Sequence, residues 1–134
     1  MNKFKLITLI TLIALIASFS NSLLANDFKE CQKVASDLNV TLPMNIDKVT
    51  QVVGTVCVPG SKRGKKVKFV YSLEISDTRI TKKGILSLRS KQVNFWCSNP
   101  TQKNMLKLFD VKYSYSMVNG TYLGANSFTI KDCR

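Results

Sequence analysis

Apolar and polar residues follow two different periods along this chain, and each period predicts a kind of element. Between residues 27 and 38 the apolar side chains recur every three or four positions, which is the spacing of one helix face. Asn26 or Asp27 can serve as the N-cap, and Glu30 stands three positions after Asp27 as in a capping box. Pro43 lies just beyond the pattern, so we expect the first helix to end before it.

Residues 46–58 and 67–75 predict two strands of one hairpin. The first segment is rich in β-branched residues, with Gly54 allowing a bulge, and the second alternates apolar with mostly polar side chains. The turn between them, residues 59–64, contains a proline and two glycines.

Residues 111–117 and 122–130 predict a second hairpin. The first of these segments alternates, and Asn119-Gly120 stands between them in the position of a type I′ turn, which needs positive φ at both central residues.

Between the hairpins, residues 81–97 place Ile85, Leu88 and Gln92 on one helical stripe, and residues 101–109 offer one or two more helical turns. The predicted order is helix, strand, strand, helix, strand, strand. We therefore expect an α+β fold, in which two helices pack on an antiparallel sheet of about four strands.

The N-terminal segment has the order of a secretory signal peptide. Lys3 and Lys5 precede the apolar residues 6–19, and a small residue, Ala25, offers a cleavage position. The apolar run is shorter than the roughly 20 residues of a membrane-spanning helix, although an uncleaved anchor and cleavage after an earlier serine are alternatives. We expect residues 1–25 to be the signal peptide, and 26–134 to be one exported domain, periplasmic or secreted, without a transmembrane segment.

Four cysteines, Cys31, Cys57, Cys97 and Cys133, lie in the predicted mature part. An even number in an exported chain indicates disulfides, whereas a zinc site is disfavoured because the chain has no histidine and no closely spaced cysteine pair. Three connectivities are possible. We favour Cys31–Cys57 and Cys97–Cys133, which would tie the first helix to the first strand and the second helix to the last strand.

The charge is strongly basic, with 20 Lys and Arg against 8 Asp and Glu. Five cations gather where the first hairpin turns, and we call this group the basic turn: Lys62, Arg63, Lys65, Lys66 and Lys68. Like charges this close repel one another, so the basic turn is a candidate binding site for an acidic protein or an anionic envelope surface. Nucleic acid is a secondary candidate, and a solvated hairpin tip is the alternative without a binding role.

Several short motifs carry a resemblance: "LPMNIDKVT" at 42–50, "YSY" at 113–115 and "DC" at 132–133. In this order they resemble a loose group of small exported bacterial proteins, mostly of unknown function. The resemblance covers nearly all of the predicted mature chain. It implies a cell-envelope location and a cystatin-like shape with a helix on a sheet, and it implies no catalytic residues.

Candidate chemistry is sparse. Without histidine, the common Ser-His and Cys-His nucleophiles are excluded, and no phosphate-binding glycine loop is present. Asp47 and Asp132 are the two carboxylates that could serve a catalytic cleft. We expect no enzymatic activity, no cofactor and no metal.

Aromatic residues offer a further candidate surface. Trp96 is either an exposed anchor or, as we favour, a ring packed over the Cys97 disulfide. Four tyrosines could form a stacking platform with the lysines, but we expect them to belong to the core if their face meets the helices; they are Tyr71, Tyr113, Tyr115 and Tyr122.

These features predict a non-catalytic binding or assembly module of the bacterial envelope, whose basic hairpin docks an anionic or acidic partner. The alternative is a secreted effector or inhibitor that acts by contact with another protein. An inhibitor would bind one soluble target stoichiometrically, whereas an assembly module would co-fractionate with membranes.

Overall fold

The computed structural model describes residues 27–60 and 66–133, and the predicted signal peptide lies outside them. The elements are, in chain order, α2 (Asp27–Asn39), β1 (Met44–Asn45), β2 (Thr50–Val58), β3 (Lys68–Ile75), α3 (Lys82–Ser87), α4 (Arg89–Ser98), α5 (Pro100–Leu108), β4 (Asp110–Met117), β5 (Tyr122–Phe128) and the 3-10 helix η2 (Ile130–Asp132).

The predicted α+β class is confirmed, but the sheet differs from the prediction in two ways. It has five strands in the order β1-β2-β3-β4-β5, because the two-residue β1 pairs with β2. Its central pair, β3 and β4, is parallel, while the other pairs are antiparallel. The prediction of an antiparallel sheet of about four strands was therefore wrong in detail. The segment α3–α4–α5 returns the chain to the end of the sheet where β3 began, and such a crossover joins parallel strands.

Both predicted hairpins are confirmed. Strands β2 and β3 pair antiparallel with a register shift between Val52 and Gly54, where a bulge was expected. Strands β4 and β5 pair antiparallel around a turn in which Gly120 has φ of +94°, a conformation that favours glycine. The predicted type I′ turn was wrong, because that turn needs positive φ at Asn119 as well, and none of the described non-glycine residues has it.

The predicted pair of helices is too few. The stripe at 81–97 is interrupted at Leu88, which lies between the end of α3 and the start of α4. Pro100 is the first residue of α5, a position where the backbone N–H that proline lacks would have no partner within the helix. The order is therefore not the simple α-β-β-α-β-β that the pattern predicted.

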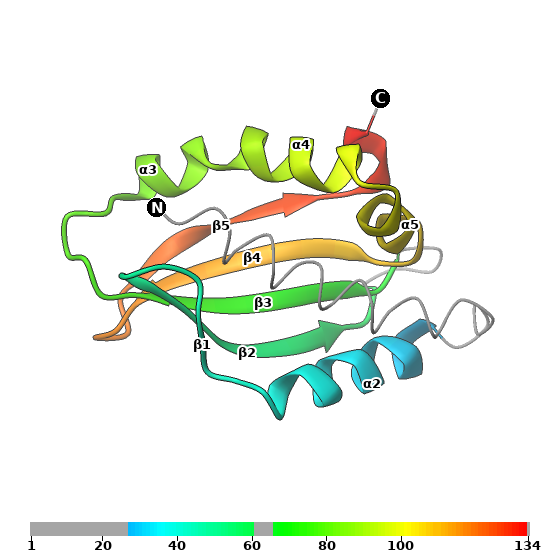
Figure 1. Cartoon of the computed structure of the whole chain (residues 1–134), viewed down its shortest axis with the longest axis horizontal. Coiled ribbons are helices and arrows are strands. Elements are labelled where there is room, and N and C mark those ends of the chain that lie inside the picture. Colours follow the sequence, from blue (N-terminus) through cyan, green and yellow to red (C-terminus); the bar gives the residue numbers. More distant parts are fainter. Residues whose placement is uncertain (1–26, 61–65, 134) are drawn as a thin grey trace.

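Helices cover one face of the sheet (Figure 1). A row of buried residues, Thr55, Tyr71, Tyr113 and Asn126, runs across β2, β3, β4 and β5 in register. At one end of this row the hydroxyl of Thr55 donates to a carbonyl of α2, and at the other end the amide of Asn126 donates to the carbonyl oxygen of Ile85 in α3. Helix α2 and the pair α3–α4 thus lie on the same face of the sheet, α2 near the β2 edge and α3–α4 near the β5 edge.

The aromatic residues form the centre of the core. Trp96 is fully buried, and its Nε1 donates to the hydroxyl of Tyr113 at 3.0 Å. Tyr71, Tyr113 and Tyr115 are buried as well, whereas Tyr122 is 52% exposed. The favoured prediction of a packed Trp96 is confirmed, and the alternative of an exposed anchor was wrong. The predicted core position is confirmed for Tyr71, Tyr113 and Tyr115, whose face meets the helices, but was wrong for Tyr122.

Two disulfides close the structure, with the pairing that the order of elements favoured. Cys31–Cys57 joins α2 to β2, with the Cα atoms 5.9 Å apart, and Cys97–Cys133 joins α4 to the residue after η2, with the Cα atoms 5.2 Å apart.

Asn39 completes the outer edge of β2. Its side-chain nitrogen donates to the carbonyl oxygen of Thr55 at 3.0 Å, and its side-chain oxygen accepts from the Thr55 backbone nitrogen at 2.8 Å. The amide thus binds both backbone groups of one residue as a neighbouring strand would, beyond the point where the short β1 ends.

Replacing Asn39 with alanine should lower the free energy of unfolding by about 1–2 kcal/mol, because both backbone groups of Thr55 lose their partner. Urea denaturation measures the loss. The matched control is Asn45→Ala, which removes a side-chain contact to Gln51 at the surface and should cost less than about 0.5 kcal/mol. Equal losses in the two variants would contradict the role of Asn39.

Candidate binding pocket

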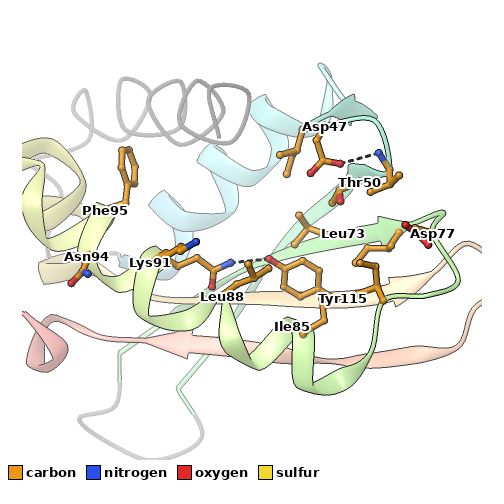
Figure 2. Close-up of a pocket in the computed structure, with 16 residues that line it drawn as sticks. Asp47, Thr50, Leu73, Asp77, Ile85, Leu88, Lys91, Asn94, Phe95 and Tyr115 are labelled. Carbon is orange, nitrogen blue, oxygen red and sulfur yellow. Dashed lines mark hydrogen bonds between the residues drawn. The ribbon is translucent and has the colours of Figure 1, made fainter. Parts of the chain in front are cut away.

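A partly open pocket of about 630 Å³ lies on the helix-covered face, between the segment that joins β1 to β2 and the helices α3 and α4 (Figure 2). Its walls and floor are mostly aliphatic and aromatic: Ile46, Val49, Leu73, Ile75, Ile80, Ile85, Leu88 and Phe95. Polar atoms reach it from Asp47, Thr50, Asp77, Lys91, Gln92, Asn94 and Tyr115. We refer to this site as the pocket.

The pocket exists because the helical layer does not cover the whole face. Helix α2 packs on β2, and α3 packs on β5, so the strands between them are left to form a floor. Leu73 of β3 and Tyr115 of β4 lie on that floor. Thr81 fixes the start of α3 as its N-cap, since its hydroxyl oxygen accepts from the backbone nitrogen of Gly84 at 3.1 Å.

A hydrogen-bonded network fixes the pocket's floor to α4. The side-chain nitrogen of Gln92 donates to the Tyr115 hydroxyl at 2.8 Å, and the side-chain nitrogen of Asn126 donates to the oxygen of Gln92 at 3.1 Å. Burial raises the pKa of Tyr115 to about 12, the hydrogen bond from Gln92 opposes this shift, and the charge of Asp47 adds to it. The Tyr115 hydroxyl therefore keeps its proton at an alkaline pH that would ionise an exposed tyrosine.

The two candidate carboxylates lie in different places. Asp47 lines the pocket and is 5% exposed, and its Oδ1 accepts from the backbone nitrogen of Val49 at 2.9 Å. Asp132 belongs to η2, where its carboxylate accepts from the Thr129 backbone nitrogen and lies 3.1 Å from Nη2 of Arg89. The structure thus places one of the pair in a cavity and uses the other to fix a helix start.

The basic turn is described only in part. Lys62, Arg63 and Lys65 lie outside the described residues. Lys66 is half-buried, and its Nζ donates to the carbonyl oxygen of Leu106 at 2.9 Å, near the end of α5, where a cation is favourable. This contact gives Lys66 a role in the fold. Lys68 lies on β3, with its side chain partly exposed.

Sequence reasoning missed most of the pocket. Gln92 stood on the predicted helical stripe without a role, and Asp47 was singled out only as a possible acid or base. Leu73, Leu88 and Tyr115 each fit an ordinary core position, and no local pattern shows that they border a shared space.

Over the described ranges, no group of three or more His, Cys, Asp and Glu side chains is placed to hold a metal ion. Among the helices that the structure describes, none has the length and apolar character needed to cross a membrane.

No protein-family model matches the chain. No curated protein matches it. Solved structures with a similar fold include a protein from Pseudomonas aeruginosa whose name describes it as secreted; it has a TM-score of 0.65 and 20% identity, over 81% of this chain and 94% of that chain.

Two further structures are pilotins of type II secretion systems. EpsS from Vibrio vulnificus has a TM-score of 0.62 and 15% identity, over 82% of this chain and 94% of its own. AspS from Vibrio cholerae has a TM-score of 0.56 and 13% identity, over 81% of this chain and 94% of its own. At these identities the comparisons establish a common fold. The two disulfides are typical of proteins from an oxidising, extracytoplasmic compartment.

Proposed function

We propose that this protein is an exported, non-catalytic binding or assembly module of the bacterial envelope, which holds a helical segment of a partner protein in the pocket. The observation that carries the proposal is the pocket itself, an apolar space left open on the face where helices cover the rest of the sheet. Two of the similar folds are pilotins of secretion systems, and this supports an assembly role over catalysis.

An amphipathic helix suits the pocket, because the lining is mostly apolar and one side is open to solvent. An amphipathic helix would place its apolar face against Leu73 and Leu88 and leave its polar face to solvent. The incoming helix would complete the layer that α2 and α3–α4 leave incomplete.

The pocket's size also suits a small apolar molecule, since such sites usually measure about 300–1,000 Å³. The experiment therefore has to identify what touches the walls. A photo-reactive benzoylphenylalanine at Leu88, which lines the pocket, should cross-link in the source cells to one polypeptide, at a segment with helical apolar periodicity. The cross-linked peptide is identified by mass spectrometry.

The matched control is the same probe at Leu86, two residues away and 59% exposed, which is outside the pocket lining. It should yield none of that adduct. Adducts shared by both positions, or adducts to lipid alone at Leu88, would contradict the proposal.

The basic turn is proposed as a second contact, for an acidic part of the same partner or for an anionic envelope surface. Its test changes Lys62, Arg63, Lys65 and Lys68 to glutamate and keeps Lys66, because Lys66 is bonded to Leu106. The quadruple variant should lose retention of envelope fragments at low salt while unfolding at the same temperature. Unchanged retention would make these residues a solvated tip.

The alternative, a secreted inhibitor, is supported by the similar fold of the secreted Pseudomonas protein. It predicts a stoichiometric complex with one soluble target, found in the culture medium instead of the envelope fraction. Fractionation of the cross-linked Leu88 sample distinguishes the two functions.

A further inference from the structure

We infer that the helical segment bound in the pocket carries a lysine or arginine side chain that pairs with Asp47. This inference rests on the proposed function, because it specifies the chemistry of the partner at the same site. The basic turn favours an acidic partner, so the pocket and the basic turn would select opposite charges.

Asp47 is unusual in its surroundings. It is a carboxylate with 5% of its surface exposed, on the wall formed by the β1–β2 segment, among Ile46, Val49 and Leu73 (Figure 2). Among the described residues, its carboxylate accepts one hydrogen bond, from the backbone nitrogen of Val49 to Oδ1. Its charge is also felt by the Tyr115 hydroxyl on the floor. The carboxylate therefore belongs to the pocket and not to the outer surface.

The other charged groups that line the pocket differ from Asp47. Asp77 is already bound by Arg79, whose Nε and Nη2 lie 3.0 and 2.9 Å from its two carboxylate oxygens. Lys91 is exposed on α4, the opposite wall. Within residues 27–60 and 66–133, the ion pairs are Arg79–Asp77 and Arg89–Asp132, so Asp47 has no cation within 4.0 Å.

Docking of an apolar helix would remove water from the open side of the pocket. A carboxylate that loses its remaining solvent is strongly destabilised unless a cation or several donors replace the water. A purely apolar segment would therefore bind more weakly, because it desolvates the Asp47 carboxylate without replacing the lost water. A segment with one cation facing the β1–β2 wall would pair with the carboxylate and offset this desolvation. Asp47 would therefore make the pocket specific for helices that carry a cation, among helices with the same apolar face.

The first experiment selects 16-residue helix-forming peptides from a displayed library on the oxidised protein and on its Asp47→Asn variant. Asparagine keeps an oxygen that can accept from Val49, so the local turn should persist, and thermal unfolding checks this. Asp37→Asn is the charge-matched control, on the exposed face of α2 and outside the pocket.

The wild-type protein and the Asp37→Asn variant should enrich apolar helices with lysine or arginine at one fixed position, and the Asp47→Asn variant should enrich apolar helices without it. Apolar helices with no cation preference on the wild-type protein would overturn the inference and leave the proposed function standing. Selection of no helical peptide at all would overturn both.

The second experiment measures the affinity of the best selected peptide and of a version with methionine in place of its cation. For the wild-type protein the methionine peptide should bind about tenfold more weakly or worse, and for Asp47→Asn the two peptides should bind alike. Equal ratios for the two proteins would contradict pairing with Asp47, because the cation would then act elsewhere.

Discussion

Replacing Trp96 with alanine should lower the free energy of unfolding by about 3–5 kcal/mol, which is among the largest losses that a single substitution can cause. Trp96 is fully buried, its ring lies 5.8 Å from that of Phe128, and its nitrogen donates to the Tyr113 hydroxyl. Alanine would leave a cavity between α4 and the sheet and would also remove a hydrogen bond. Guanidinium denaturation of the oxidised protein measures the loss.

Trp96→Phe separates the two contributions. It keeps most of the ring volume and removes the N–H group, so the cost should be near 1–3 kcal/mol, roughly that of leaving the buried Tyr113 hydroxyl unpaired. If the phenylalanine variant were as unstable as the alanine variant, the hydrogen bond and not the packing would dominate at this position. A loss below about 1 kcal/mol for alanine would show that Trp96 is not a central core residue.

Removing the Cys31–Cys57 disulfide by replacing both cysteines with alanine should cost about 2–4 kcal/mol, since the bond closes a long loop between α2 and β2. The residues are separated by 26 positions, and both lie in the core. Chemical denaturation of the double variant, compared with the oxidised parent, measures the change.

The corresponding double variant of Cys97 and Cys133, separated by 36 positions, provides a comparison. In the chain-entropy account the longer loop should cost slightly more, by a few tenths of a kcal/mol. A loss at Cys31–Cys57 that far exceeds the loss at Cys97–Cys133 would show that packing of the buried Cys31 side chain, and not loop closure, dominates.

The sequence predicted the elements whose cause is local. The hairpin at Asn119-Gly120 follows from the positive φ that Gly120 allows, and the register shift in β2 lies next to Gly54, as predicted. The alternation at residues 111–117 placed Tyr113 and Tyr115 on one face, and their burial follows once the helices cover that face.

Elements whose cause is distant were missed. Strand β1 has two residues, too few for a periodic pattern, and it exists because Met44 and Asn45 reach the edge of β2. The parallel pairing of β3 with β4 depends on the path of three intervening helices, which no window of sequence contains.

The pocket was missed for the same physical reason. Four separate segments contribute its lining, and residues such as Leu73 and Leu88 satisfy an ordinary amphipathic pattern whether their neighbour is a core residue or an open space. Asp47 was singled out from the sequence, but only as a carboxylate that could serve a catalytic cleft.

The disulfide Cys97–Cys133 fixes the end of α4, whose earlier turns form one wall of the pocket. A wall fixed by a covalent bond loses little freedom when a ligand enters, so binding is not weakened by the cost of ordering it. The same bond makes the geometry depend on thiol oxidation, which the cytosol prevents and the periplasm promotes. If the proposed function holds, a newly made chain would bind with full affinity only after its cysteines are oxidised.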